Sequence, residues 1–326
     1  MKIDDSAKVA GAQHRAKRKM WADDLASFTT LKIGKVRHDF HEHPLLQLAE
    51  LERLADELLP LQQCRFALPG MTYGSDFAHN AQHPEGLAVQ EVFSRIEEPG
   101  SAIALFNIES IPRYKVLLTE ILDTMRPIVE RDQGKIFMET GFIFISAPPS
   151  VTPFHIDREN NFWLQLQGRK TMNVWPNTDR TTIPAAAVED YIVAHRTRKV
   201  RFKEEHRSRS HEYDVGPGDG VYFPSTSPHM TQTDRTWVQP GEGVSISFGV
   251  NFYTEHTRHT ARVHQMNRVL RNGLRLKPRP PGASKAADAA KASVGRMIGA
   301  TRQLGKTVLT PLLKRKTASR PPPGSY

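Results

Sequence analysis

The sequence contains very little cysteine and no long apolar run. Cys64 is the only cysteine among 326 residues, which excludes a disulfide framework or a thiolate zinc site and fits a reducing compartment. No apolar stretch approaches the roughly 18 residues of a transmembrane helix, and no apolar block follows the basic residues near the N-terminus as in a secretory signal. We therefore expect a cytoplasmic protein without a membrane span.

Acidic residues are scarce in the C-terminal part of the chain. Residues 258–326 contain 16 Lys and Arg against the single acid Asp288 and so carry +15, whereas residues 1–257 carry −5 and the whole chain +10. A basic surface of uniform distribution would indicate a nucleic-acid or anionic-membrane partner. Because the basicity is concentrated, we expect a mildly acidic folded body followed by a basic tail.

Two amphipathic helices are expected before the middle of the chain. Leucines recur at three- and four-residue steps over 44–59, between Pro44 and Pro60, and this spacing predicts a helix. A second helix follows Pro112, and Pro127 must kink or end it. Between these helices, Ala102–Ile108 is typical of a short buried strand.

After Gly134 the sequence changes to short β-rich runs. These runs are separated by Pro and Gly turns, without a helical pattern between them, and this arrangement predicts an antiparallel sandwich or barrel. The expected strands are Lys135–Met138, Gly141–Ser146, Asn161–Leu166, Thr171–Trp175, Gly220–Pro224 and Val244–Tyr253.

The expected fold is mainly β with flanking helices, and the 38% hydrophobic residues suffice for a substantial core. In chain order we expect an irregular N-terminal segment (1–43), a helical and mixed part (44–134), a β domain (135–254), a C-terminal helix (255–276) and a basic low-complexity tail (277–326).

Two residues at a spacing of two carry the strongest chemical signal. His155 and Asp157 would project from the same face of an extended strand and could reach one ion. An imidazole and a carboxylate, completed by a distant histidine, form the facial triad that leaves half of an octahedral Fe(II) open. His229, after a tight turn and a strand, is the candidate for the third ligand, while His206 and His211 compete from a charged stretch.

The motif H-x-D is weak alone, because a surface histidine beside an aspartate is common. The neighbouring residues strengthen it. Lys170 lies in the next expected strand and Thr152 stands just before the ligands, so an ammonium and a hydroxyl could hold a carboxylate inside the barrel. A lysine directed into a β core is costly unless it meets an anion. By contrast, the H-x-x-H-x-H cluster at His38 fits no ligand pattern, and we interpret it as surface histidines.

Two sequence blocks resemble a known family. The first, T-P-x-H-x-D-x-x-x-N-F-x-x-Q-x-x-G-x-K, covers 152–170. The second, V-G-P-G-D-x-x-Y-x-P, covers 215–224 and is followed by His229 and by V-N-F at Val250–Phe252. In this order the blocks are similar to those of the JmjC/cupin-like Fe(II)- and 2-oxoglutarate-dependent oxygenases (cupin 8).

The resemblance implies a double-stranded β-helix (jelly-roll or cupin) core and a set of site residues. His155, Asp157 and His229 would bind Fe(II). Thr152 and Lys170 would hold the distal carboxylate of 2-oxoglutarate. The remaining implied contacts are Asn161 and Asn251 near the metal-chelating end of this cosubstrate, with Trp163 packed against it.

The function implied by the resemblance is that of an Fe(II)/2-oxoglutarate-dependent dioxygenase. It would hydroxylate a protein side chain or a small metabolite, with O2 consumed and 2-oxoglutarate converted to succinate and CO2. One alternative is a non-catalytic cupin that binds a ligand or regulates, with a basic tail touching nucleic acid. Another is an N-methyl demethylase of the same iron chemistry.

The sequence gives weaker evidence about binding partners than about the metal site. The stretch 196–209 holds seven Arg and Lys against two Glu, and a solvated hairpin is the simplest interpretation; the alternative is a lip that recruits polyanions. The tail 277–326 offers the same alternative, although a disordered extension is favoured. The apolar stripe within 260–275 could form a homodimer, or pack onto its own barrel.

Overall fold

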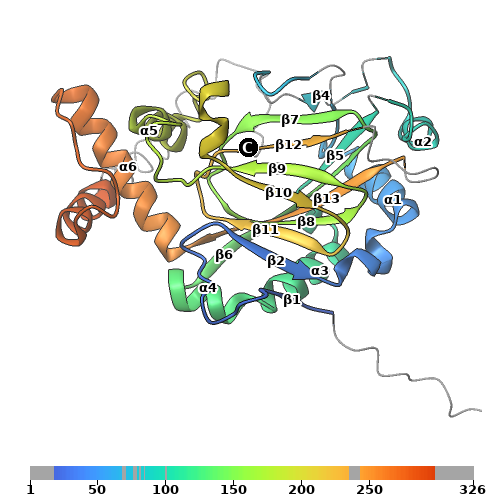
Figure 1. Cartoon of the computed structure of the whole chain (residues 1–326), viewed down its shortest axis with the longest axis horizontal. Helices are drawn as coiled ribbons and strands as arrows, with labels where there is room; N and C mark the ends of the chain where they lie inside the picture. The colour runs from blue at the N-terminus through green and yellow to red at the C-terminus, as the bar shows by residue number, and fades with distance from the viewer. Residues whose placement is uncertain are drawn as a thin grey trace, which may run out of the picture.

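The protein is described here by a computed structural model, in which two antiparallel sheets face each other between flanking helices (Figure 1). The fold is mainly β with curled sheets, consistent with the predicted jelly-roll. Figure 1 shows the helices α5 (Ala185–Ala194) and α6 (Glu255–Gly273) together at one end of the strands. The residues that the structure describes are 18–67, 71–75, 79–80, 82–83, 85–99, 101–234 and 243–297.

The larger sheet has nine strands in the order β1-β2-β11-β8-β13-β6-β5-β3-β4, and the smaller has four in the order β10-β9-β12-β7. The strands are β1 Met20–Trp21, β2 Gly34–His38, β3 Cys64–Ala67, β4 His79–Asn80, β5 Ala102–Phe106, β6 Ile136–Ser146, β7 Ser150–His155, β8 Asn160–Gln167, β9 Lys170–Val174, β10 His211–Val215, β11 Asp219–Phe223, β12 His229–Thr233 and β13 Ser245–Thr254.

Helices cover the outer face of the larger sheet. The leucines that predicted the first helix, such as Leu51 and Leu54, are fully buried in the same cluster as Leu117 of the third helix. Each such leucine contributes about 1.5–3 kcal/mol through burial. The helices are α1 Leu48–Leu58, α2 Val89–Ser94, α3 Pro112–Asp123, α4 Arg126–Gln133, α5 Ala185–Ala194 and α6 Glu255–Gly273, with short 3-10 turns η1 Phe40–Glu42, η2 Pro44–Leu46, η3 Ile108–Ser110 and η4 Glu204–Arg209.

Strand alternation divides the core into an outer and an inner layer. On β8, Phe162 and Leu164 pack in the outer cluster with the helices, whereas Trp163 packs in a separate cluster with Met172 of β9 and Phe223 of β11. Because β9 belongs to the smaller sheet and β11 to the larger, this second cluster lies between the sheets. Side chains that alternate with the outer apolar set therefore face the interior.

A buried amide connects the helical layer to the sheets. Gln133, the last residue of α4, donates to the carbonyl of Thr30 and to the hydroxyl of Tyr222. Its side-chain oxygen accepts from Asn160 at 2.9 Å and from Thr254 at 3.0 Å. Since every one of these groups is buried, each bond also avoids the cost of an unsatisfied polar atom, about 1–3 kcal/mol.

The smaller sheet is covered by α5 and by the basic stretch after it. Val200 and Phe202 pack with Trp175 and Phe154 on the outer face of this sheet, so the stretch 196–209 is a packed strap as well as a charged one. At least four of its seven cations make ion pairs with acids of this chain: Lys199 with Asp190, Lys203 with Glu205, Arg207 with Glu204 and Arg209 with Asp179.

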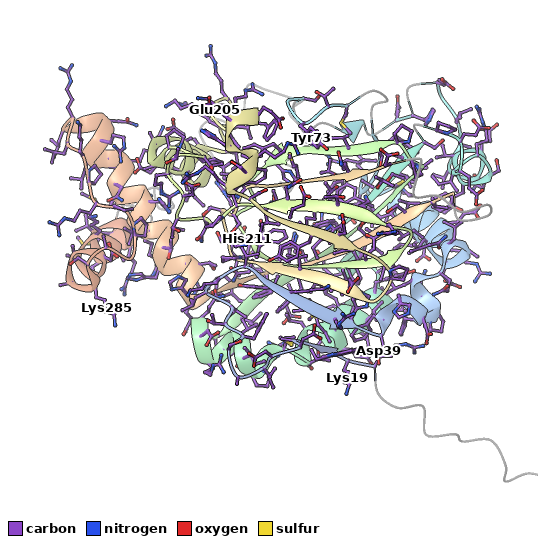
Figure 2. All side chains as sticks on the ribbon, in the orientation of Figure 1. Lys19, Asp39, Tyr73, Glu205, His211 and Lys285 are labelled. Carbon is purple, nitrogen blue, oxygen red and sulfur yellow. The ribbon has the colours of Figure 1, made fainter. Side chains whose placement is uncertain are left out.

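Several expected boundaries differ from the structure. The segment 1–43 was expected to be irregular, but β2 within it pairs with β11 and extends the larger sheet. Near it, the Lys19 N–H donates to Asp39 Oδ1 at 2.7 Å, and both residues lie at the same edge of the molecule (Figure 2). The two expected strands after Gly134 are one strand, β6. Residues 1–17 lie outside the described part.

A helix interrupts the β region, where none was expected. α5 is short and rich in alanine, and the adjoining prolines and charged residues obscure its period. The strands β10 and β12 were also missed as strands, because their residues are largely polar. The expected break at Pro127 is confirmed, since α3 ends at Asp123 and α4 begins at Arg126.

The start of the expected tail is folded. Residues 285–297 form a helix in which Ala292 and Asp288 are buried, and a Cβ at Gly295 would lie 2.8 Å from the carbonyl oxygen of Arg262 in α6. This close approach explains why a small-residue helix can pack here. The rest of the tail, 298–326, lies outside the described residues. The predicted dimer contact through 260–275 stays a prediction, and part of that segment packs on α5 of the same chain.

Within the described ranges, no helix combines the length and apolar character needed to cross a membrane.

His38, which we interpreted as a surface histidine, is 2% exposed. Its Nε2 lies 3.1 Å from the carbonyl oxygen of Gln165, and burial, followed by repulsion from His41, lowers its pKa from 6.5 to about 4. In the unfolded chain the His38 imidazole therefore binds a proton near pH 6.5, whereas in the folded chain it binds one only near pH 4.

We expect this group to cost stability as the pH falls. Between pH 7 and pH 5 it should lower the free energy of unfolding by about 2 kcal/mol. A His38→Gln variant should show a correspondingly smaller loss in denaturant titrations at the two pH values, whereas His211→Gln, at an exposed position, should behave as the parent does. An unchanged pH dependence in His38→Gln would contradict this assignment.

Candidate metal centre

The two histidines of the predicted triad lie opposite each other on neighbouring strands. β7 ends at His155 and β12 begins at His229, and these residues are partners in the antiparallel pairing. Partners in an antiparallel pair project to the same side of the sheet. Their ring centroids are 4.0 Å apart, so the strand pairing itself places both imidazoles at one point.

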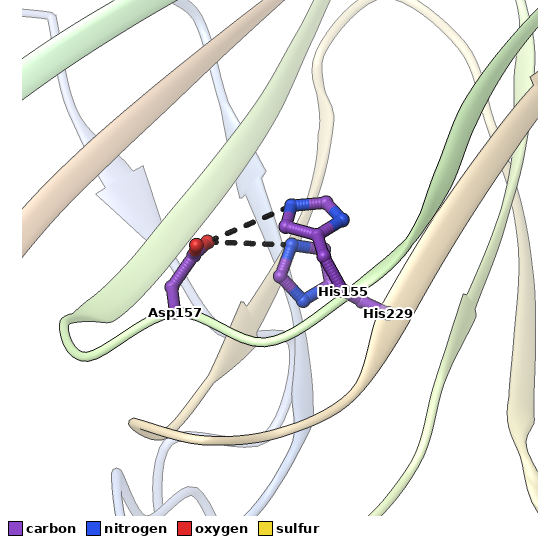
Figure 3. Close-up of side chains that lie close together, drawn as sticks. All are labelled: His155, Asp157 and His229. Atoms are coloured by element: carbon purple, nitrogen blue, oxygen red, sulfur yellow. Dashed lines mark ion pairs between the residues drawn. The ribbon is translucent and has the colours of Figure 1, made fainter. Parts of the chain in front are cut away.

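Asp157 reaches the histidines from a loop. We expected it on the same strand as His155, but β7 has ended two residues earlier. The loop is fixed by its backbone, since the Thr226 N–H donates to the carbonyl oxygen of Asp157 at 2.8 Å. Figure 3 shows the carboxylate directed from this loop toward the two rings.

The three side chains form a compact ligand set. Asp157 Oδ2 lies 3.4 Å from His229 Nε2 and 3.9 Å from His155 Nε2. The candidate ligand atoms all lie within 4.8 Å of one another, and within the described part of the chain this is the one such group. Distances of this size fit three donors around a single divalent ion, with each donor about 2 Å from it.

Backbone carbonyls orient both imidazoles. His155 Nδ1 lies 2.7 Å from the carbonyl oxygen of Pro153, and His229 Nδ1 lies 3.0 Å from that of Ser227. A carbonyl oxygen accepts only, so each Nδ1 carries the proton and each Nε2 presents its lone pair toward Asp157. Burial, followed by repulsion from His155, lowers the pKa of His229 to about 4, which keeps this ring neutral at physiological pH as a ligand must be.

The competing histidines lie elsewhere. His206 is buried in η4, where its Nε2 lies 3.5 Å from Glu205. His211 is exposed at the start of β10 and is separated from β12 by β9. Of the candidates weighed from the sequence, only His229 reaches His155 and Asp157.

Lys170 is a buried cation on the inner face of the smaller sheet. It is 4% exposed and shares its face of β9 with Met172, which packs between the sheets. Among the described residues no acid or hydrogen-bond acceptor pairs with its ammonium, and burial lowers its pKa from 10.5 to about 8. An unpaired charge in this position is costly unless an anion joins it.

The turn before Lys170 admits only glycine. Gly168 has a φ of +66°, and a Cβ there would lie 2.7 Å from the carbonyl oxygen of Val244. Glycine alone adopts this conformation without strain or collision. The turn thereby sets where β9 begins, and with it the side to which Lys170 points.

Two asparagines on the inner face have unsatisfied polar atoms. Asn161 is fully buried and pairs with Asn251 across β8 and β13. Neither Nδ2 nor Oδ1 of Asn161 has a partner among the described residues, and the same holds for Oδ1 of Asn251. Buried amides are normally hydrogen-bonded, so these atoms are free to bind a polar ligand. Trp163 lies on the same face of β8 and is 4% exposed.

Thr152 reaches the inner face through a β-bulge. Thr152 pairs with Thr231, while His155 pairs with His229, so three residue steps along β7 match two steps along β12. A spacing of three on a regular strand would place Thr152 and His155 on opposite faces. The bulge corrects the register, and both side chains face the same side.

A small cavity of about 80 Å³ adjoins His155 and Asp157. It reveals a residue that the sequence reasoning missed, Glu159, which lines it together with Asn251. Glu159 continues the spacing of two in H-x-D-x-E, and that repetition was an available signal. The Tyr253 hydroxyl donates to Glu159 Oε1 at 2.5 Å, and burial raises the pKa of Glu159.

Two further residues were missed, both aromatic. The Phe223 ring lies 4.5 Å from that of His229 and forms one wall of the site. Tyr213 lies on β10 and pairs with Met172 of β9, next to the pair formed by Val215 and Lys170. It packs against the inner cluster. Burial raises the pKa of Tyr213, so its hydroxyl stays protonated near Lys170.

The family model of the JmjC domain matches residues 131–257. This range contains β6 through β13 and every residue of the ligand set. Residues 131–257 form a JmjC domain. A JmjC domain with the His155, Asp157 and His229 set supports Fe(II) and 2-oxoglutarate use, in agreement with the resemblance in the sequence.

Solved structures were compared with the whole chain. One, of YcfD, a ribosomal oxygenase from Escherichia coli, is 16% identical, with a TM-score of 0.37, and the match covers 74% of this chain and 57% of that one. A second structure of E. coli YcfD is 14% identical, with a TM-score of 0.41, covering 84% of this chain and 65% of that one. The chain thus spans less than two thirds of the length of the proteins it matches.

A YcfD structure that contains cobalt and 2-oxoglutarate is also similar, at 16% identity and a TM-score of 0.39, with 74% of this chain and 57% of that one covered. The chain matches none of the curated proteins with which it was compared.

The residues of the JmjC domain fit a divalent metal, and substitution tests this directly. Because each donor is one of three, His155→Ala, Asp157→Ala and His229→Ala should each weaken Fe(II) binding at least 100-fold. Anaerobic calorimetry with Fe(II), or with Co(II) as a substitute, measures this. His211→Ala should bind as the parent does. Parent-like affinity in the Asp157 variant would exclude the proposed ligand set.

Proposed function

We propose that the protein is an Fe(II)/2-oxoglutarate-dependent dioxygenase that hydroxylates a protein side chain or a small molecule. One observation carries the proposal: the compact His155, Asp157 and His229 set opens onto the same interior as the unpaired, buried ammonium of Lys170, inside a JmjC domain. A site that only stabilised the fold would not leave a charge uncompensated there.

The triad would hold the iron through two neutral imidazoles and one carboxylate. Three protein ligands leave the other positions of an octahedral ion for the cosubstrate and O2. When bound, iron and 2-oxoglutarate supply an oxidative decarboxylation by O2 that yields succinate and CO2 and inserts one oxygen atom into the substrate. The chain's contribution is to hold His155 and His229 in a fixed tautomer through the carbonyls of Pro153 and Ser227.

The inner face would hold 2-oxoglutarate between two groups of residues. The Lys170 ammonium and the Thr152 hydroxyl would bind its distal carboxylate, and the Tyr213 hydroxyl lies on the strand next to Lys170. At the other end, the unsatisfied Asn161 Nδ2 would donate to the group that meets the metal, with Asn251 beside it on β13.

Trp163 would pack against the carbon chain of the cosubstrate and exclude water from it. It is 4% exposed and faces the interior beside Met172. Exclusion of water strengthens the charge interactions of Lys170 and protects the reacting centre from side reactions.

We include a cytoplasmic location in the proposal, supported by the single cysteine, Cys64, which is buried and free.

Lys170→Met separates binding of the cosubstrate from binding of the metal. We expect 2-oxoglutarate affinity to fall at least tenfold, because the charge partner is lost, while Fe(II) affinity is retained. Without ligand the variant should be more stable than the parent by about 1–3 kcal/mol, since a buried unpaired cation has been removed. Calorimetry and denaturant titration measure the two effects.

Lys32→Met is the matched control, because Lys32 is exposed and should change neither quantity. A Lys170 variant that is less stable and binds 2-oxoglutarate normally would show that the lysine serves the fold.

Turnover tests the proposed function itself. The Fe(II)-loaded protein should convert 2-oxoglutarate to succinate in air, slowly without substrate and faster with a cell extract, and not under argon. NMR detection of succinate measures it, and Asp157→Ala should lose at least 100-fold of the rate.

The same variant distinguishes an enzyme from a binding protein. If Asp157→Ala retains 2-oxoglutarate affinity and the parent never produces succinate, the domain is a ligand-binding module. Mass spectrometry of the extract then separates a stable gain of one oxygen from loss of a methyl group as formaldehyde.

A further inference from the structure

A larger cavity, of about 420 Å³, lies at the end of the barrel that carries the triad. Its walls come from α6, the end of α5, the start of β6 and the end of β13. Tyr253, two residues beyond Asn251, is in one wall, and Thr226, whose N–H binds the carbonyl of Asp157, is in another. The cavity therefore adjoins the loop that supplies the carboxylate ligand.

The cavity is lined by three arginines and by no acid. Arg258 and Arg262 lie one turn apart on α6, and Arg158 comes from the loop after Asp157. In the described part of the chain neither Arg258 nor Arg262 has an ion pair. Burial, followed by repulsion from Arg296 and Arg258, lowers the pKa of Arg262. Like charges at this spacing destabilise a helix by about 0.2–0.5 kcal/mol, so the pair serves something other than helix stability.

Other arginines on the same helix show what a structural role requires. Arg268 binds Asp190 at 2.9 Å, and Arg271 binds Glu189 at 2.9 Å, so both hold α6 to α5. The difference between these two residues and the pair at 258 and 262 lies in what faces them: acids of α5 in one case, the cavity in the other.

The apolar part of the wall favours a peptide over a nucleic acid. The Arg258 guanidinium lies 3.8 Å from the Phe137 ring centroid, and Tyr253 stacks with that ring at 5.8 Å and 18°. Phe137 is thus occupied by neighbours, and base stacking on it is blocked. Ile192 and Val193 contribute aliphatic surface, and Met138, an exposed methionine with a flexible side chain, also lines the cavity.

We propose that this cavity binds an acidic segment of a protein substrate, with its carboxylates on Arg258 and Arg262 and its apolar side chains on the aliphatic wall. The inference rests on the proposed function and narrows its substrate to a protein. Tyr253 lines this cavity while its partner Glu159 lines the small cavity beside the triad. A bound substrate segment that passes Tyr253 and Glu159 would bring its following residues to the metal site.

The basic tail is excluded as the occupant by its charge, since residues 298–326 contain six Lys and Arg and no acid. The strap 196–209 is a weaker acceptor of acidic chains, because at least four of its seven cations already bind acids of this protein. Charge complementarity therefore favours an acidic partner at Arg258 and Arg262 over either alternative.

Fluorescence anisotropy with a labelled octapeptide of alternating Glu and Leu tests the proposal on the full-length protein. The parent should bind this peptide in preference to the same peptide with Lys in place of Glu. In an Arg258→Glu/Arg262→Glu variant the affinity should fall at least tenfold, and Arg258→Gln/Arg262→Gln should give an intermediate loss. Arg196→Glu/Arg198→Glu, which makes the same change of net charge in the strap, should bind within twofold of the parent.

The outcomes are separable from those of the proposed function, because peptide binding is measured without iron or 2-oxoglutarate. Fe(II) and 2-oxoglutarate affinities should be the same in all variants, and thermal unfolding should confirm that they fold. Equal binding by the cavity and strap variants overturns the proposal. So does tighter binding of a single-stranded oligonucleotide, or a change of oligomeric state in the cavity variant, which would identify the face as a contact between copies.

Discussion

The site depends on the pairing of β7 with β12. Because His155 and His229 are partners in this pair, two of the three candidate ligands come together as a consequence of backbone hydrogen bonding alone. The third needs only a short loop, whose position is fixed by the Thr226 N–H. The remaining features of the domain serve to keep these two strands in register and to shape the space in front of them.

The two polar regions of the interior are built on opposite principles. Around Gln133 each polar group meets a partner, and the amide links α4 to three strands. In the interior that the triad adjoins, Lys170 and Asn161 are also buried; the Asn161 amide has no partner among the described residues, and the Lys170 ammonium has no acid beside it. The satisfied region around Gln133 stabilises the fold and so offsets the cost of the unsatisfied region. In that second region, the unpaired groups raise the free energy of the empty site, and a bound ligand that pairs with them lowers it.

The sequence was sufficient for the site's chemistry and insufficient for its local geometry. His155, Asp157 and Lys170 could be predicted because their types and spacing are unusual in a β-rich region. In addition, they occur in the same order as in a known family. The loop position of Asp157 and the bulge at Thr152 could not, since both depend on where β7 ends, and hydrogen bonds to β12 decide that. The helix α5 and the helix at 285–297 were missed because alanine carries little periodic signal.

The bulge in β7 has a consequence for how such a domain can change over time. A deletion of one residue between Thr152 and His155 would remove the bulge and leave a spacing of two, so both side chains would still face the interior, with His155 and His229 as partners. The metal ligands and the cosubstrate contact are thus two separate modules on one strand, joined by a length of chain that can shorten. A lineage could lose the extra residue by this single step and keep both the metal ligands and the position of Thr152.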